Sequence, residues 1–168
     1  MDRSKKVIFV SHCILNQNTV VCPLARAKGP YREIIEKIME YDIGIHQMPC
    51  PEFRKLGLKR MPMNKAEYDT PEYRNLCNSL AKDTITILKE YISNDYKVIG
   101  LLGINGSPTC SINGIKGIFM EELLSLLEKE KTYLNKIDVP EDYMDMKDNK
   151  EFISKLESFL SSLSSKRM

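Results

Sequence analysis

The stretch Lys-Val-Ile-Gly-Leu-Leu-Gly at residues 97–103 is a short apolar run, typical of a buried strand. Two earlier runs resemble it: Lys-Val-Ile-Phe-Val-Ser at 6–11 and Ile-Gly-Ile-His-Gln-Met-Pro at 43–49. Segments with helical periodicity alternate with these runs, which favours an α/β fold over an α+β fold. We therefore expect one domain over residues 1–168, built on a small, open, mainly parallel sheet flanked by helices.

The spacing of apolar residues predicts four helices, near residues 31–41, 70–93, 118–131 and 150–163. Thr70-Pro71-Glu72 is typical of a helix start, with an N-cap, a first-turn proline and an early acid. A short fourth strand is expected at 135–139. Residues 16–29 and 50–69 are predicted to be irregular, and the Ser/Lys-rich C-terminal tail is expected to fray.

Charge and hydropathy narrow the range of partners. The 168 residues carry 25 basic and 23 acidic side chains, a net charge of +2, which argues against coating nucleic acid through bulk charge. No run approaches the roughly 18 apolar residues needed to span a bilayer, so no membrane partner is expected. The apolar run after the basic start is too short for a secretory signal. We therefore expect a reducing cytoplasm, where clustered cysteines such as some of these five are more often catalytic or metal-binding than disulfide-bonded.

A local basic run interrupts this balance. Arg54, Lys55, Lys59 and Arg60 fall within seven residues that contain no acid. Such a run is usually a solvated face. Because it follows Cys50-Pro51-Glu52 directly, phosphate contacts near a functional site, and hence RNA binding, form an alternative hypothesis.

Three cysteines follow the three predicted strands: Cys13, Cys50 and Cys110. The carboxyl ends of parallel strands gather along one edge of a sheet, where ligands bind. Thiols almost 100 residues apart in sequence are therefore expected to meet in space. Thiolates suit zinc, copper(I) and iron–sulfur clusters. No C-x-x-C pair is present, which argues against a zinc ribbon or a thioredoxin-like motif.

The remaining cysteines and the histidines have weaker claims to this site. A zinc site would need a fourth ligand, which His12 or Cys22 could supply. His12 and His46 are better explained as structural histidines. Cys77 lies on the apolar stripe of the helix at 70–93, so it is predicted to be a buried core thiol.

Two side chains near the cysteines have the chemistry of catalysts. Glu52 is two residues after Cys50, and Ser107 is three residues before Cys110. A [4Fe–4S] cluster held by three cysteines leaves one iron open as a Lewis acid, beside which a carboxylate and a hydroxyl could activate water and move protons. Capping and turn roles are the alternatives for both residues. The Gly-rich loop after the third strand matches neither nucleotide fingerprint.

At these residues the chain resembles the thiouracil desulfurase (desulfidase) family. The shared elements are an S-x-C at 11–13, a C-P-E at 50–52 and an S-P-S/T-C at 107–110, in the same order over roughly residues 6–120. The resemblance implies a [4Fe–4S] cluster on the three cysteines, with Glu52 and Ser107 as the catalytic pair. It also implies non-redox removal of sulfur from a thiolated uracil or thiouridine, 4-thiouridine of tRNA included, with release of hydrogen sulfide. Residues 14–18 and 53–57 depart from the family pattern, so these segments leave the substrate open.

Two other functions are compatible with the same cysteines. A cluster- or zinc-binding module that carries sulfur for a partner protein would need the thiols but neither Glu52 nor Ser107. A cysteine-nucleophile hydrolase would use Cys110 in its Gly-rich loop, although no histidine has an evident route to that thiol. No feature of the sequence indicates an oligomeric state.

Overall fold

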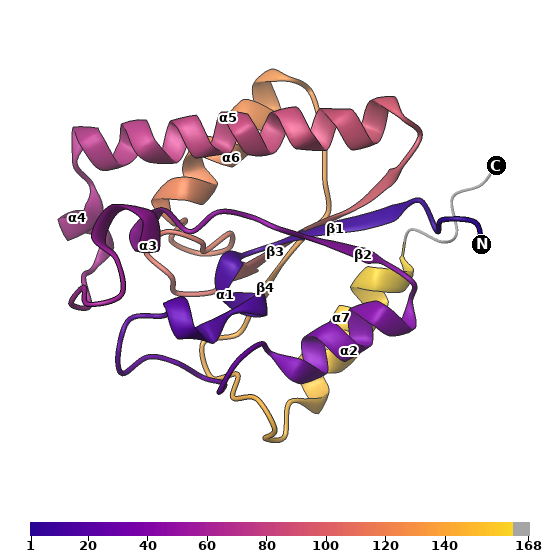
Figure 1. Ribbon diagram of the computed structural model, residues 1–168, viewed down its shortest axis with the longest axis horizontal. Coiled ribbons are helices and arrows are strands. Elements are labelled where there is room, and N and C mark those ends of the chain that lie inside the picture. The colour runs from indigo at the N-terminus through magenta and orange to yellow at the C-terminus, as the bar shows by residue number, and fades with distance from the viewer. Residues whose placement is uncertain (163–168) are drawn as a thin grey trace.

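A four-stranded, all-parallel sheet forms the centre of the protein, seen in a computed structural model that describes residues 1–162 (Figure 1). The strands lie in the order β2-β1-β3-β4. Their bounds are β1 Lys6–Val10, β2 Gly44–Gln47, β3 Lys97–Ile104 and β4 Lys136–Val139. The three apolar runs and the short run at 135–139 are therefore the strands, and the predicted α/β fold is confirmed.

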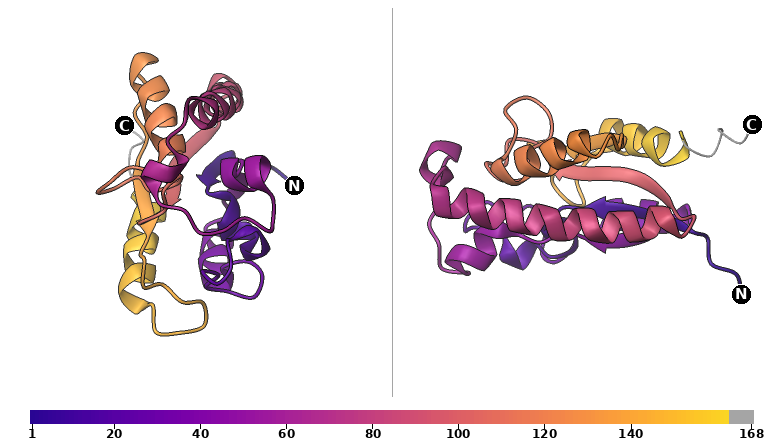
Figure 2. Two further views of the ribbon diagram at one scale, coloured as in Figure 1. Left: turned by 90° about the vertical axis from the view of Figure 1, so that its left-hand side faces the viewer. Right: turned by 90° about the horizontal axis from the view of Figure 1, so that it is seen from above.

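Helices cover both faces of this sheet (Figures 1 and 2). Helices α5 (Pro71–Ser93) and α6 (Ile118–Lys129) pack on one face, and α2 (Arg32–Glu40) and α7 (Lys150–Ser161) pack on the other. Successive residues of a strand point to opposite faces. Phe9 accordingly joins the core under α5 and α6, while Ile8 and Val10 join the core under α2 and α7. Burial on both faces explains why the strands are continuous apolar runs.

The long helix α5 begins where the sequence predicts. The Thr70 hydroxyl accepts a hydrogen bond from the Tyr73 amide, and Pro71 occupies the first turn, where its missing N–H costs nothing. The predicted helices near 31–41, 118–131 and 150–163 form with ends that differ by at most two residues. No helix within residues 1–162 combines the length and the apolar character needed to cross a membrane.

The prediction that residues 50–69 form a loop is wrong at two short helices, α3 (Pro51–Leu56) and α4 (Lys65–Tyr68). Pro51 begins α3 at a first-turn position, where proline is favourable, rather than breaking the chain. A capping box between Asn64 and Glu67 starts α4.

The segment predicted to be irregular at 16–29 contains one short element, the 3₁₀ turn η1 (Gln17–Thr19). Helix α1 (His12–Leu15) lies just before this segment, directly after β1. The predicted fraying of the C-terminal tail concerns residues 163–168, which lie outside the described part of the chain.

The loop between β3 and α6 is held tightly against the sheet. The buried Asp138 carboxylate, on β4, accepts hydrogen bonds from the backbone amides of Ile112 and Asn113. On β3, a Cβ added to Gly103 would lie 2.4 Å from Asp138 Oδ1 and 2.6 Å from the Cys110 carbonyl oxygen. Only glycine leaves room for this approach. Packing against β3 and β4 therefore positions the loop that carries Cys110.

We predict that Gly103→Ala lowers the free energy of unfolding by about 1–3 kcal/mol, because the added methyl group overpacks this contact. Gly29→Ala is the matched control, since a Cβ at Gly29 would meet no atom within 4 Å. Its effect should stay within about 0.5 kcal/mol. Urea unfolding measures both changes, and equal effects of the two substitutions would contradict the close approach at Gly103.

Candidate functional site

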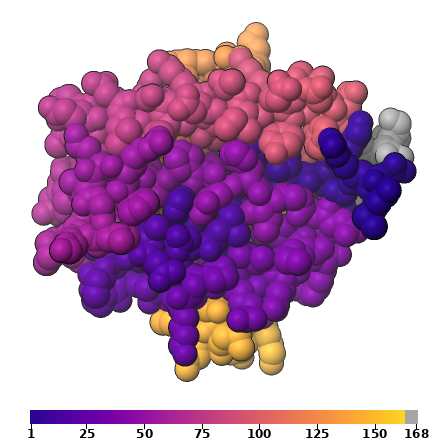
Figure 3. Space-filling view, viewed as in Figure 1, coloured from indigo at the N-terminus to yellow at the C-terminus, as the bar shows by residue number. Residues whose placement is uncertain are grey.

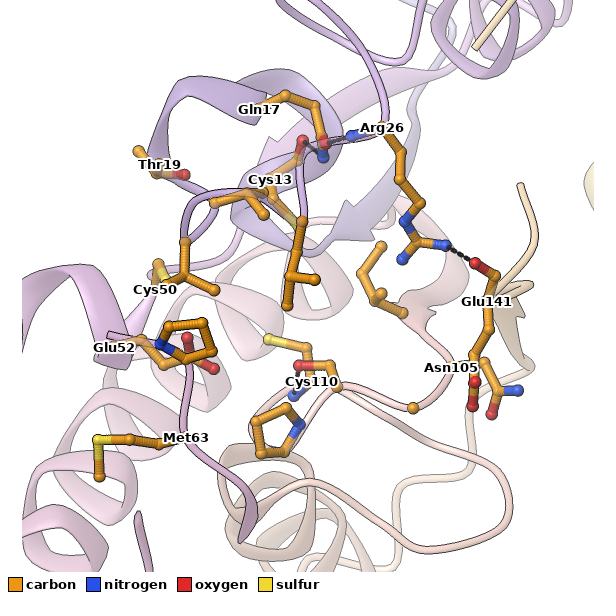
Figure 4. A pocket seen from close by; sticks show the side chains of 18 of the residues that line it. Cys13, Gln17, Thr19, Arg26, Cys50, Glu52, Met63, Asn105, Cys110 and Glu141 are labelled. Carbon is orange, nitrogen blue, oxygen red and sulfur yellow. Dashed lines mark hydrogen bonds between the residues drawn. The ribbon is translucent and has the colours of Figure 1, made fainter. Parts of the chain in front are cut away.

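A cavity of about 340 Å³ opens at the carboxyl ends of the strands, and all three predicted cysteines line it (Figure 4). Cys13 follows β1, Cys50 follows β2 and Cys110 follows β3. Glu52 and Ser107 line the same cavity, so all five predicted site residues share one space. Such a crevice is where open parallel sheets bind their ligands.

Each cysteine is held by its own backbone element. Cys13 lies in the short helix α1. Cys50 is the N-cap of α3, and its Sγ accepts a hydrogen bond from the Phe53 amide at 3.4 Å. The Cys110 amide donates to Ser107 Oγ at 3.0 Å, within the loop that is fixed against β3. The three thiols thus reach the cavity on separate segments, and the sheet sets how these segments lie relative to one another.

Burial dominates the acid–base behaviour of these thiols. It raises the pKa of Cys13 to about 12, and the neighbouring Cys50 adds to the rise while Arg26 opposes it. The pKa of Cys110 is raised well above its usual value and that of Cys50 is raised, in both cases first by burial. The thiols are therefore neutral at neutral pH, and thiolates need a bound cation to offset the loss of hydration. Within residues 1–162, no three histidine, cysteine or acidic side chains are arranged to hold a metal ion.

The Glu52 carboxylate, 9% exposed, is surrounded by hydrogen-bond donors. The Thr109 hydroxyl donates to Oε1 at 2.7 Å. The Tyr68 hydroxyl donates to Oε2 at 3.1 Å, and Arg60 Nη2 lies 3.3 Å from the same oxygen. Both carboxylate oxygens of Glu52 therefore accept hydrogen bonds, and the Arg60 guanidinium places an opposite charge beside them.

A second hydroxyl extends this network into the core. Tyr73 and Thr109 form a 2.8 Å hydrogen bond between their hydroxyl oxygens. Because the Thr109 proton is donated to Glu52, Tyr73 must be the donor of this bond. Tyr73 is buried in the core under α5 and α6, so the chain of hydrogen bonds ends there. It therefore fixes Glu52 and does not lead to solvent.

Ser107 has both a structural and a free hydrogen-bonding capacity. Its Oγ accepts from the backbone amides of Thr109, at 3.3 Å, and Cys110, at 3.0 Å, which is the turn-capping role considered from the sequence. Among the described residues the Ser107 hydroxyl donates to no partner. The hydroxyl proton is therefore available to a molecule in the cavity.

The other candidate residues lie elsewhere. Cys77 is fully buried under α5 and α6, as predicted for a core thiol. Cys22 is exposed, and neither it nor His12 is among the cavity-lining residues. His46 lies on β2 with its ring centroid 4.6 Å from that of Phe9, a packing contact.

The basic run divides into two kinds of residue. Arg54, Lys55 and Lys59 are exposed, as a solvated face would be. The Arg60 side chain is only 3% exposed and pairs with Glu52. The prediction of one uniform basic surface is therefore wrong at Arg60, because a nearby buried carboxylate captures its guanidinium.

The sequence did not identify the hydrogen-bond partners of Glu52, nor Arg26, which also lines the cavity. Thr109 lies inside the motif that holds Ser107 and Cys110, which is the one signal that could have found it. Tyr68 lies 16 positions from Glu52 in a segment predicted to be irregular, and Tyr73 lies 21 positions away in the predicted helix at 70–93. Arg26, whose Nη1 donates to the carbonyl oxygens of Pro140 and Glu141, lies in a segment without a motif.

The fold and the cavity define an α/β protein with three cysteine thiols and a hydrogen-bonded glutamate where the strands of a parallel sheet end. The chain is 42% identical over 158 residues to the uncharacterized protein MJ0003 of Methanocaldococcus jannaschii, covering 94% of this chain and 99% of that protein. It belongs to the same family as MJ0003. No model of a known protein family and no solved structure matches the chain.

We predict that the thiols of the reduced, metal-free protein differ widely in reactivity. Cys22 should react with iodoacetamide at neutral pH, and Cys13 and Cys110 should react on the order of 100-fold more slowly, because burial suppresses the reactive thiolate. Mass spectrometry of digested protein measures each site. In the control Cys22→Ser the fast phase should vanish; comparable rates at Cys13 and Cys22 would contradict the assignment.

Proposed function

We propose that the protein is an iron–sulfur-dependent desulfidase, which replaces the sulfur of a thiolated pyrimidine by oxygen and releases hydrogen sulfide. The observation that carries the proposal is the meeting of Cys13, Cys50 and Cys110 with Glu52 and Ser107 around one cavity. The motifs shared with the thiouracil desulfurase family support the same reaction. Water supplies the new oxygen and both protons of hydrogen sulfide, so the reaction needs no electron donor.

The residues around the cavity suit a [4Fe–4S] cluster on Cys13, Cys50 and Cys110. Thiolates are the usual ligands of such clusters, and each cysteine binds a different iron, so the three need not converge on one point. Ser11 adds a further argument. Its buried Oγ has no hydrogen-bond partner among the described residues, yet it lies near enough to Cys110 to lower the pKa of that thiol. A hydroxyl there could donate to a sulfur ligand.

Cys13, Cys50 and Cys110 would hold the cluster, which would supply Lewis-acid chemistry toward a thiocarbonyl sulfur. Glu52 Oε1 accepts one hydrogen bond, from Thr109, and keeps room for a second. It can therefore accept a proton from a water molecule that attacks the thiocarbonyl carbon. The Ser107 hydroxyl, free to donate, would orient the substrate or hand on a proton.

The cavity bears on the substrate. Its volume of about 340 Å³ lies near the lower end of the roughly 300–1,000 Å³ typical of small-molecule sites and would have to hold the cluster as well as the substrate. A small thiolated base or nucleoside, such as thiouracil or 4-thiouridine, is therefore favoured. Thiouridine within tRNA remains a hypothesis, in which the exposed Arg54, Lys55 and Lys59 would contact phosphates. Five free cysteines support action in a reducing cytoplasm.

We expect protein purified without oxygen to be brown and to contain about four irons per chain. It should release sulfide from thiouracil or 4-thiouridine. Glu52→Gln should lower sulfide release by about 10²–10⁴-fold while the iron content stays unchanged, because it removes the proton acceptor and not a ligand. Visible absorption, metal analysis and a sulfide assay measure the three properties.

The exposed Glu72, in the first turn of α5, provides the control. Glu72→Gln should keep both iron and activity. A colourless protein with stoichiometric zinc would contradict the proposal. An iron-loaded wild-type protein that releases no sulfide would favour the sulfur-carrying module instead.

A further inference from the structure

We propose that Arg60 is a positioning residue for Glu52, holding one carboxylate oxygen so that the other faces the reaction. This inference deepens the proposed function and rests on it for the role of Glu52. It concerns a residue that the sequence presents as one member of a surface basic run.

Arg60 and Tyr68 together occupy Glu52 Oε2. The Arg60 Nη2 and Nε atoms lie 3.3 and 3.4 Å from this oxygen, and the Tyr68 hydroxyl donates to it at 3.1 Å. An ionised carboxylate oxygen accepts about two hydrogen bonds, so Oε2 is filled. Oε1 accepts only from Thr109, which leaves it as the oxygen with capacity for water.

Arg60 also ties together the segments that form the cavity. Its Nη1 donates to the Gly57 carbonyl oxygen at 2.9 Å, just after α3, and its Nη2 donates to the Thr19 carbonyl oxygen at 2.7 Å, in η1. The segment after β1 and the segment after β2 adjoin on the surface, where the indigo and purple regions meet (Figure 3). The Arg60 guanidinium therefore connects the segment after β1, which carries Cys13, with the segment after β2, which carries Cys50 and Glu52.

Because the Arg60–Glu52 ion pair is buried, the charge of Glu52 needs both an opposite charge and hydrogen-bond donors. The side chains of Arg60 and Glu52 are 3% and 11% exposed, the lowest exposures of any ion pair among the described residues. A buried charge is stable only when it is paired and hydrogen-bonded. Arg60 meets both needs of Glu52, because it supplies the opposite charge and donors in a planar fork. Lysine would supply the charge without the fork.

The kinetic test compares Arg60→Lys and Arg60→Gln with the control Arg32→Gln, which removes an exposed guanidinium on α2. Arg60→Gln should lower kcat for sulfide release on the order of 100-fold, the scale of a misplaced catalytic group, with KM and iron content near the wild-type values. Arg60→Lys should recover part of the loss, and Arg32→Gln should change nothing. Parallel loss of iron and activity in both Arg60 variants would make Arg60 a purely structural residue and overturn the proposal.

A second readout does not depend on the reaction. In metal-free protein labelled with ¹³C-glutamate, the band that disappears in Glu52→Gln assigns the Glu52 carboxylate in the infrared spectrum. Arg60→Gln should shift that band, since Oε2 loses the donors and the charge of the guanidinium. Arg60→Lys should shift it less, because the ammonium keeps the charge without the planar fork. An unchanged band in Arg60→Gln would refute the positioning role.

The two readouts separate the two proposals. If wild-type, iron-loaded protein releases no sulfide, the desulfidase proposal fails, and the infrared spectra still decide whether Arg60 governs Glu52. If sulfide is released while Arg60→Gln keeps both its kcat and its Glu52 band, only the role of Arg60 fails.

Discussion

The parallel pairing of β2, β1 and β3 is the constraint on which the site depends. Phe9 on β1 pairs with His46 on β2 and with Leu101 on β3, and both faces of the sheet are buried against helices. A shift of one residue would turn every side chain of a strand to the other face, so packing on both sides holds the register. The register in turn fixes where each strand ends. Three segments then leave the same edge, and each brings one cysteine to the cavity.

This dependence explains what could be predicted from the sequence. A strand buried on both faces must be a continuous apolar run, and the residues just past it must lie at the ligand-binding edge. These two rules alone bring Cys13, Cys50 and Cys110 together. They apply because backbone pairing and burial, not particular side-chain contacts, determine the placement.

The partners of Glu52 obey no such rule. Thr109 and Glu52 are 57 positions apart, and their contact follows from how the loop after β3 packs against α3. In the sequence Arg60 cannot be distinguished from a surface arginine. Its burial follows only from the way the segment after α3 packs against η1. Likewise Pro51 breaks or begins a helix depending on whether the preceding Cys50 can cap it, which depends on tertiary structure. Sequence therefore indicates the edge of the sheet, while the chemistry at that edge depends on packing between distant segments.

The cysteine thiols and the Glu52 carboxylate have different electrostatic surroundings in the cavity, and this difference bears on function. Loss of hydration raises the pKa of the Cys13 and Cys110 thiols, which keeps them protonated until a cation binds. Glu52 is buried with a guanidinium and two hydroxyl donors. A sulfur-carrying module would need only the thiols, and a buried ion pair is often no more stabilising than apolar residues of similar size. The contribution of the buried Glu52 ion pair to stability therefore does not explain its place beside the thiols. A role for Glu52 in proton transfer, next to the group that the three cysteines are proposed to bind, explains it.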